Sequence, residues 1–341
     1  MKEFFRTAVE HRLWAVLAAT LTLVSCSPGE DRQQAGPDAA GVADRPAITR
    51  GLARMTDPHV FDCDVPGWRI TAQGQITALD GSQWTVPAEV AFKSGPKATD
   101  LYNDCSGVML DKASDLDPAT IPVIEVDAAG EVITAYIFGD NYSEIYVNGR
   151  LVGVDPVPYW PFNTGAVRFR VKRPFTVGFK LVDWEENLGI GSETMKGVPF
   201  HLGDGGLTAV FKDAAGATIA LTDGRWRALP YYVGPFRDAA CLDLAGGKRG
   251  SSRCKSTTEA NGADLFAAHW PVPDNWAAPD FDDSGWPAAV VYTNAEIGGS
   301  LNRPAYSNFA DLFDDPAADA QFVWSGNLLL DNLVLLRGTV R

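Results

Sequence analysis

Short stretches of the chain alternate apolar and polar positions with a period of two, which is typical of β-strands. Residues 131–138 (EVITAYIF) carry β-branched and aromatic residues on both alternating faces, so they predict a strand that is buried on both sides. Residues 175–184 (FTVGFKLVDW) and 328–340 (LLLDNLVLLRGTV) predict further strands. Because no helical pattern intervenes, the expected fold is all-β, a β-sandwich or jelly roll.

Turn signals join several of these strands. Asn148-Gly149 lies between EIYV and RLVG, and an Asn-Gly pair supplies the positive-φ positions of a tight hairpin turn. Residues 206–223 (GLTAVFKD-AAG-ATIALTD) predict a second hairpin. The 33 Gly and 22 Pro of the chain break it at short intervals, which favours a sheet-rich fold with many turns.

The strand pattern divides the folded part into two expected regions. Residues 57–123, with ITALDGSQWTVPAEVAF at their centre, predict a smaller β-rich region. Residues 124–341 predict the main sandwich, and the boundary is placed near Asp117-Pro118.

Residues 1–25 have the pattern of a secretion signal. The first twelve residues include three basic side chains, and residues 13–25 are apolar or small apart from two threonines. This apolar stretch is shorter than the roughly 20 residues that a membrane-spanning helix needs. We therefore expect a signal peptide rather than a permanent membrane span.

The end of this signal, Leu23-Val24-Ser25-Cys26, resembles the lipobox of bacterial lipoproteins. The resemblance implies cleavage before Cys26 and lipid attachment to it, and Ser27 implies sorting to the outer membrane, with a periplasmic or cell-surface position. The alternative is an ordinary signal that ends in a cysteine. Residues 26–56 hold hardly any large apolar residue, so they predict a flexible tether.

The charge balance bears on the partners to be expected. Lys and Arg number 29 against 43 Asp and Glu, a formal net charge of −14. Such a field repels nucleic-acid phosphates, and no long basic cluster opposes it, so we expect no nucleic-acid partner and contact with the membrane through the lipid anchor alone.

Four cysteines remain after Cys26, an even number in a chain addressed to an oxidising compartment. Two disulfides are expected, and proximity in sequence favours Cys63–Cys105 and Cys241–Cys254 among the three possible connectivities. The alternative is metal ligation or a catalytic thiol. The sequence has neither a CxxC pair nor a Cys/His cluster with zinc spacing, which argues against it.

Three motifs together resemble the galactose-binding-like jelly rolls that accompany β-galactosidase and α-L-rhamnosidase catalytic domains. They are DNYSEIYVNGRLVG at 140–153, AAGATIALTDGRW at 214–226 and FDDSGW at 281–286, and they occur in the order of the family. The likeness covers about residues 124–341. It implies a jelly roll that binds carbohydrate, although a shared fold does not establish a shared function.

One segment departs from the family pattern. A strand with the pattern W-I-W…N…R-x-x-F usually precedes the hairpin, whereas here its counterpart, residues 322–340, ends the chain. We therefore predict a circularly permuted jelly roll, with an ordinary last strand as the alternative.

The candidate ligand-binding side chains come from three segments. Asp183-Trp184-Glu185-Glu186-Asn187 closes a buried-looking strand, and carboxylates beside an indole suit sugar hydroxyls or Ca²⁺. An exposed acidic turn with Trp184 in the core is the alternative. A glycine-rich loop follows these residues, and the hairpin motif supplies the rest. The full set is Asp140, Asn141, Tyr142, Asp183, Trp184, Glu185, Asn187, His201 and Asp204.

Aromatic residues are also frequent between residues 226 and 286, and we expect one or two of them to be exposed sugar platforms. They are Trp226, Tyr231, Tyr232, Trp270, Trp276 and Trp286.

Three functions follow from these observations. The first is a non-catalytic, surface-anchored lipoprotein that binds a carbohydrate. The second is a glycan-active enzyme acting through Asp183, Glu185 and His201, although GxSxG, HExxH and GxGxxG are absent. The third is a module of an envelope complex that binds another protein.

Overall fold

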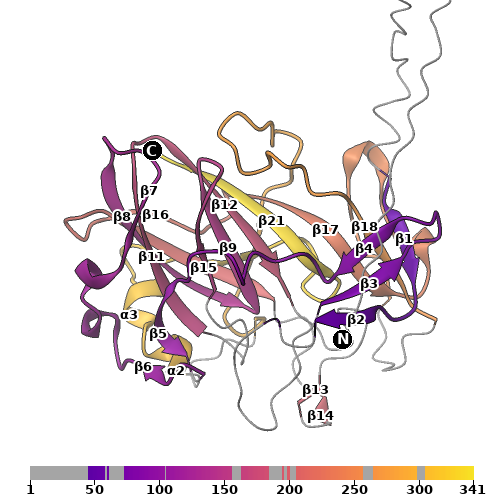
Figure 1. Ribbon diagram of the computed structural model, residues 1–341, viewed down its shortest axis with the longest axis horizontal. Coiled ribbons are helices and arrows are strands. Elements are labelled where there is room, and N and C mark those ends of the chain that lie inside the picture. The colour runs from indigo at the N-terminus through magenta and orange to yellow at the C-terminus, as the bar shows by residue number, and fades with distance from the viewer. Residues whose placement is uncertain are drawn as a thin grey trace, which may run out of the picture. The chain divides into compact units, whose positions relative to one another are not determined.

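The computed structural model describes residues 45–57, 60, 73–103, 105–155, 163–183, 205–255, 264–297 and 304–341, and the backbone of 194–195 and 198–199. Residues 42–341 form one compact unit, and everything below concerns this unit. The expectation of an all-β fold is confirmed, because two large antiparallel-rich sheets dominate the described chain (Figure 1).

The first large sheet has seven strands, and each neighbouring pair is antiparallel. Their spatial order is β1 (Ala47–Arg50), β18 (Phe266–His269), β17 (Arg227–Phe236), β21 (Asp331–Val340), β12 (Phe175–Val182), β9 (Tyr142–Val147) and β10 (Arg150–Val154).

The second large sheet has nine strands. Its path is β19 (Val290–Tyr292), β20 (Phe322–Trp324), β15 (Gly206–Lys212), β8 (Glu131–Asp140), β11 (Asn163–Val171), β5 (Thr99–Asn103) and β6 (Val108–Met109). Beside this path, β16 (Thr218–Leu221) pairs with β15, and β7 (Val123–Glu125) runs parallel to β11.

Smaller elements complete the described unit. A three-stranded sheet consists of β2 (Arg54–Asp57), β3 (Gln73–Thr77) and β4 (Gln83–Val86), and a two-stranded one of β13 (Thr194–Met195) and β14 (Val198–Pro199). Two short helices are α2 (Pro304–Ser307) and α3 (Ala310–Phe313). Single 3₁₀ turns lie at Ala113–Asp115, Pro118–Thr120, Ala239–Cys241 and Ala245–Gly247.

The main core lies between the two large sheets. Strand β12 directs Phe175, Val177, Phe179 and Leu181 into it, as the period-two alternation of the sequence requires. Side chains of β8, β11 and β15 from the nine-stranded sheet belong to the same cluster. This arrangement is a β-sandwich.

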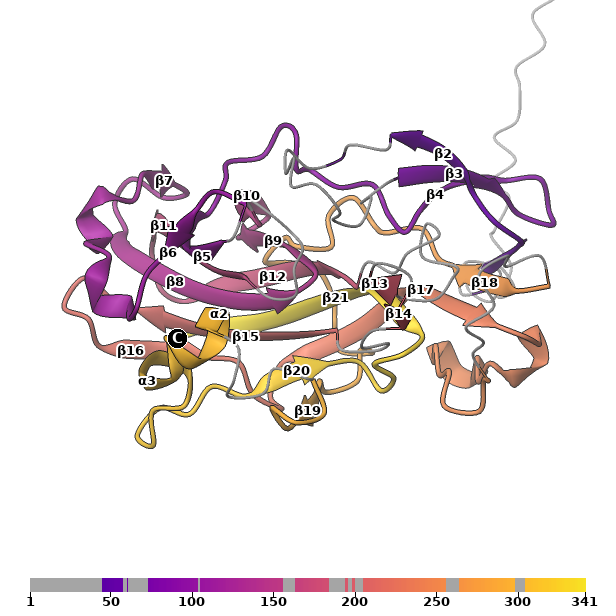
Figure 2. The ribbon, with the colours of Figure 1, turned by 90° about the horizontal axis from the view of Figure 1, so that it is seen from below.

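The nine-stranded sheet is also covered on its outer face. Ile133 and Ile137 of β8 belong to the core between the sheets, whereas Phe138 packs outward on the short helices, with its ring centroid 5.0 Å from that of Tyr306. Helix α2 contacts β5 and β11, and α3 contacts β15; Figure 2 shows the two helices next to each other. The prediction that residues 131–138 are buried on both faces is thus confirmed.

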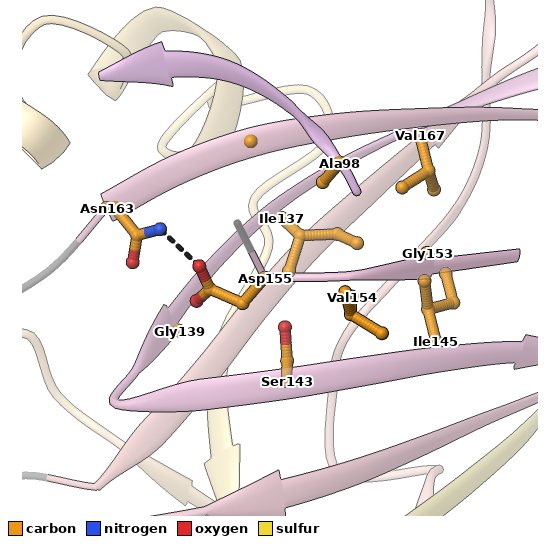
Figure 3. A pocket seen from close by; sticks show the side chains of 11 residues that line it. Ala98, Ile137, Gly139, Ser143, Ile145, Gly153, Val154, Asp155, Asn163 and Val167 are labelled. Carbon is orange, nitrogen blue, oxygen red and sulfur yellow. Dashed lines mark hydrogen bonds between the residues drawn. The ribbon is translucent and has the colours of Figure 1, made fainter. Parts of the chain in front are cut away.

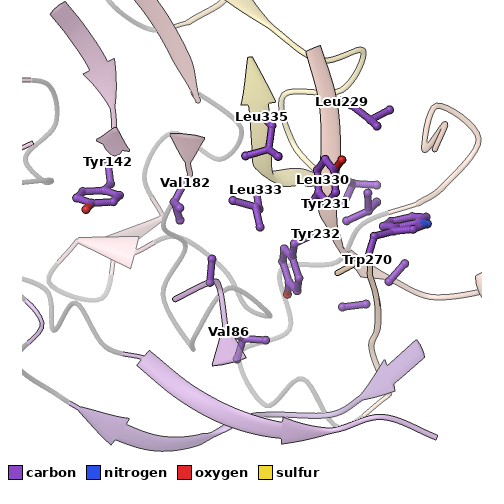
Figure 4. Close-up of a cluster of buried hydrophobic side chains, with 14 of the residues drawn as sticks. Val86, Tyr142, Val182, Leu229, Tyr231, Tyr232, Trp270, Leu330, Leu333 and Leu335 are labelled. Atoms are coloured by element: carbon purple, nitrogen blue, oxygen red, sulfur yellow. The ribbon is translucent and has the colours of Figure 1, made fainter. Parts of the chain in front are cut away.

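A third cluster covers the outer face of the seven-stranded sheet. Leu333 and Leu335 of β21 pack there with Val86 of the three-stranded sheet. Figure 4 shows the side chain of Tyr232 pointing from β17 toward Val86 of β4. The three-stranded sheet therefore lies against the larger one as an additional layer.

The Asn148-Gly149 turn has the backbone that the sequence predicts, with φ of 49° at Asn148 and 81° at Gly149. Strands β9 and β10 form the expected hairpin on either side of it. Residues 322–340 supply β20 and β21, which lie within the two large sheets. The final run is therefore a strand of the sandwich, and its permuted origin stays a prediction.

Some segments differ from the expected organisation. Residues 47–50 fall within the segment predicted as a tether, yet they form β1 and pair with β18, because main-chain hydrogen bonds to an edge strand need no large apolar side chains. Strands β5 and β7, from the expected lead-in region, pair with β11 of the main sheet. Residues 1–44, including Cys26, lie outside the described residues.

The disulfide predicted between Cys241 and Cys254 is present, with the two Cα atoms 4.9 Å apart. Cys105 is also disulfide-bonded. Its predicted partner, Cys63, lies outside the described residues, so that pairing stays a prediction.

Candidate functional site

The structure brings three of the predicted ligand-binding residues together at one end of the sandwich. Asp140 ends β8 and Asp183 follows β12. Between them, the backbone N–H of Asn141 donates a hydrogen bond to the Val182 carbonyl (3.1 Å). Asp140, Asn141 and Asp183 are all buried. The backbone at Gly205 also lies against Asp183, since a Cβ there would come within 2.9 Å of its Oδ2.

Tyr142, the next predicted residue, is part of a buried polar network. Its hydroxyl donates to Glu144 Oε1 (3.1 Å), and the Tyr146 hydroxyl donates to Glu144 Oε2 (2.7 Å). Burial and the neighbouring carboxylate raise the pKa of both tyrosines, so they stay protonated donors. Lys180 Nζ lies 3.9 Å from Glu144 Oε1 and supplies the counter-charge.

The other predicted residues, Trp184, Glu185, Asn187, His201 and Asp204, lie outside the described residues. Their convergence with Asp140 and Asp183 stays a prediction. Where side chains are described, no group of three or more His, Cys, Asp or Glu is placed to hold a metal ion.

A small cavity between the sheets lies close to this end (Figure 3). Asn163 donates a hydrogen bond to Asp155 Oδ1 (2.5 Å) at its rim, and Ser143 and Gly139 line it. Its volume of about 10 Å³ matches a single water, so it is too small for an organic ligand.

A larger cleft, of about 390 Å³, lies where the edge strand β4 meets the outer face of the seven-stranded sheet. We call it the aromatic cleft. Residues from the small sheet, from β12, β17 and β21, and from β18 and the segment after it line it together. They are Gln75, Gln83, Trp84, Thr85, Pro87, Ala88, Glu89, Lys180, Tyr231, Tyr232, His269, Trp270, Val272 and Leu333.

The aromatic side chains of this cleft contact one another. The Trp84 ring lies 5.0 Å from the His269 ring at an interplanar angle of 30°, and the Tyr232 ring meets His269 edge to face at 4.8 Å. Tyr232 and His269 are buried, whereas Trp84 is only half-buried. Trp84 therefore presents aromatic surface to the cleft over a rigid aromatic support.

A backbone irregularity in β17 explains why the adjacent residues Tyr231 and Tyr232 both line the cleft. Neighbouring residues of a regular strand point to opposite faces. Strand β17 shifts register against β21 between Pro230 and Tyr232 and again between Tyr232 and Val233. Such a bulge re-aims side chains, and both Tyr231 and Tyr232 line the cleft.

Polar groups complete the lining. The side-chain amide of Gln75 donates to Thr85 Oγ1 (2.6 Å), and that of Gln83 donates to Thr77 Oγ1 (2.8 Å). These bonds hold both glutamine side chains across the small sheet. Glu89 is exposed, and Lys180 Nζ donates to its backbone carbonyl. Amide, carboxylate and ammonium groups thus surround an aromatic surface.

His269 is an uncharged member of this lining. Burial lowers the pKa of its imidazole to about 3, so the ring is neutral at pH 7. Its Nε2 lies 2.9 Å from Thr49 Oγ1 of β1. The neutral ring therefore links β1 to the lining of the cleft and adds no charge there.

The expectation of one or two exposed platforms among the aromatics of residues 226–286 is wrong. All six are at most 6% exposed, because they form the clusters on both faces of the seven-stranded sheet. Sequence reasoning missed Trp84, which lies outside that range. The signal that could have found it is an indole between polar residues, Gln83 and Thr85, in a short edge strand.

Comparisons with known proteins add no relative. No family model, no curated protein and no solved structure matches the chain. Among the described residues, no helix is both long and apolar enough to cross a membrane.

Proposed function

We propose that this protein is an exported lipoprotein whose sandwich binds carbohydrate in the aromatic cleft. The observation that carries the proposal is the half-buried Trp84 indole, supported by His269 and surrounded by the amide and charged groups of the lining. The resemblance of three motifs to galactose-binding-like modules supports the same ligand class.

The cleft has the chemistry that sugars require. An aromatic face stacks on the apolar C–H face of a pyranose ring, while amides and charged groups exchange hydrogen bonds with its hydroxyls. Its volume of about 390 Å³ lies within the range of small-molecule sites. A mono- or disaccharide is the matching ligand.

Binding without hydrolysis is the better-supported activity of this cleft. Glycoside hydrolysis generally needs two carboxyl groups on either side of the scissile bond. Among the described residues that line the cleft, Glu89 is the single carboxylate. A lone exposed carboxylate suits hydroxyl recognition.

The proposed anchor is a lipid on Cys26, which would hold the folded unit at the outer membrane. It rests on the sequence pattern that ends in Cys26. Labelling cells with a radioactive fatty acid tests it: wild-type protein should take up label, and Cys26→Ser should not.

Glycan-array screening of the purified protein, followed by calorimetry with the sugar that binds best, tests the cleft. We expect Trp84→Ala to weaken binding at least about tenfold, because the loss of one stacking face removes about 1.4 kcal/mol or more. Leu79→Ala is the matched control: Leu79 follows β3 in the same small sheet, is 68% exposed and does not line the cleft.

Two results would overturn the proposal. One is sugar binding that Trp84→Ala leaves unchanged in a protein of wild-type thermal stability. The other is an array on which no glycan binds.

A further inference from the structure

We infer that a second cleft, at the C-terminal end of β21, is a binding site for a small organic oxyanion. This cleft has a volume of about 650 Å³ and lies where β21 extends past the first residue of β17. We call it the arginine cleft. It shares no lining residue with the aromatic cleft, so the inference stands apart from the proposed function.

The charge of the arginine cleft is opposite to that of the whole chain. Four arginines and two aspartates line it, a side-chain excess of two positive charges in a protein of net charge −14. They are Arg225, Arg227, Arg337 and Arg341, with Asp223 and Asp283. A local positive field on an acidic protein attracts anions selectively.

Two of these arginines have carboxylate partners. Arg225 Nε donates to Asp223 Oδ2 (2.7 Å), and the buried Arg337 Nε donates to Asp283 Oδ2 (2.8 Å). Arg337 also donates to the carbonyls of Trp276, Ala278 and Phe281. Both aspartates are thereby engaged, and Arg337 is fixed in place.

Arg227 carries one of the two positive charges that the aspartates of the cleft do not balance. It lies directly opposite Arg337 in the β17–β21 pairing, an arrangement of like charges that is unfavourable by itself. Its guanidinium donates to the Trp286 carbonyl (2.8 Å), and within the described residues it forms no ion pair. Because Asp283 already balances the charge of Arg337, an oxyanion beside Arg227 would balance the charge of Arg227 and accept hydrogen bonds from its remaining donors.

The strand edge adds main-chain groups and an apolar floor. The pairing of β17 with β21 stops at Arg337, so Gly338 and Thr339 have a strand partner on the β12 side alone. At Gly338 a Cβ would come within 2.6 Å of the Trp226 ring, so the glycine lets this indole lie against the strand. Trp226 and Gly338 both line the cleft.

The ligand chemistry follows from these groups. A planar guanidinium binds carboxylate, sulfate or phosphate with paired hydrogen bonds. The volume of about 650 Å³ is larger than a single inorganic ion needs and matches an organic molecule that carries such a group. Arg227 and Arg341 are the side chains that we assign to the oxyanion.

Calorimetric titrations of the purified protein test the site with citrate, galacturonate, glucose 6-sulfate and glucose 6-phosphate as probes. We expect at least one probe to bind, and Arg227→Gln to weaken that binding at least tenfold. Arg150→Gln is the matched control, because Arg150 is also exposed and also donates to a backbone carbonyl, that of Glu125. The four probes distinguish carboxylate, sulfate and phosphate.

The outcomes separate the two clefts. Trp84→Ala should leave anion binding unchanged, and Arg227→Gln should leave binding of the neutral sugar unchanged. The inference is overturned if no probe binds at about 10 mM, a concentration that detects even weak binding. Equal weakening by Arg227→Gln and Arg150→Gln would also overturn it, since general electrostatics would then explain the binding.

Discussion

Asp331 and His269 are buried titratable side chains with displaced pKa values. The pKa of Asp331 lies above its ordinary value, and the pKa of His269 lies below its ordinary value. Burial raises the pKa of Asp331 to about 7. The hydroxyls of Ser325 and Ser251 donate hydrogen bonds to the carboxyl at 2.6 and 2.8 Å, and these bonds act in the opposite direction, to lower the pKa. Burial lowers the pKa of His269 to about 3. Each group links the free energy of unfolding to pH.

The two linkages oppose each other. Between pH 3.8 and about 7 the folded protein keeps a proton on Asp331 that the unfolded chain has lost, so stability falls as pH rises. Between about pH 3 and 6.5 the unfolded chain binds a proton at His269 that the folded protein lacks, so stability rises with pH. From about pH 4 to 6.5 these two contributions nearly cancel.

Asp331→Asn should therefore expose the slope that His269 causes. We expect the unfolding free energy of this variant to rise with pH between about 4 and 6.5 more steeply than that of the wild type, by up to about 1.4 kcal/mol per pH unit. Urea unfolding at several pH values measures it. Parallel profiles of variant and wild type would show that the Asp331 carboxyl does not titrate as described.

Among the elements, the loop closed by Cys241 and Cys254 carries side chains that contact residues of the seven-stranded sheet and of the segment after β18. Arg249 lies over the Tyr231 ring at 4.1 Å and over the Trp270 ring at 4.8 Å, and Ser251 donates to Asp331. The loop is rich in Gly and Ser, and its regular structure is a single 3₁₀ turn at Ala245–Gly247 and an isolated β-bridge between Asp243 and Gly250. The disulfide limits the conformations of this loop in the unfolded chain.

Cys254→Ser should lower the unfolding free energy by about 2–4 kcal/mol, because it removes a cross-link that spans 13 residues. Thermal unfolding followed by circular dichroism measures the change. Ser252→Ala, at an exposed position of the same loop, is the control and should be neutral. A Cys254→Ser protein as stable as the wild type would mean that side-chain contacts alone order the loop.

Elements whose signal is local were predictable from the sequence. Strand β8 and the Asn148-Gly149 hairpin are specified by patterns within a few residues, and the structure contains both. Strand β1 was missed because its only pattern is the short AITR, and its stability comes from β18, over 200 residues away in sequence. Pairing of that kind leaves no local trace.

The candidate site was less predictable for the same reason. Asp140 and Asp183 belong to one predicted set of ligand-binding residues, and the hydrogen bond from the backbone N–H of Asn141 to the Val182 carbonyl joins the segments that carry them. The aromatic cleft, however, needs Trp84 of the small sheet and Tyr232 of the large one in one lining. Neither the packing of the two sheets nor the register shift in β17 can be read from the pattern of apolar residues.

At the scale of the whole molecule, β21 holds the seven-stranded sheet together. It pairs with β17 on one side and with β12 on the other (Figure 1). Its side chains enter both the core between the sheets and the cluster on the outer face. Its interior residues, among them Val334, Leu335 and Leu336, are fully buried.

Deletion of residues 331–341 should abolish the folded state, because the loss of these buried side chains and of two strand ladders far exceeds the 5–15 kcal/mol by which domains are usually stable. Near-ultraviolet circular dichroism and limited proteolysis measure it. Val290→Ala, a 40% exposed residue of the edge strand β19, should fold normally. A deletion variant with wild-type protease resistance would show that the remaining strands suffice.

The central position of β21 also sets an order on events during biosynthesis. Without residues 331–340 the strands β1, β18 and β17 form one group and β12, β9 and β10 another, with no ladder between them. The ribosome makes the joining strand after all six of the others. A nascent chain therefore cannot complete the seven-stranded sheet until residues 331–340 have been synthesised.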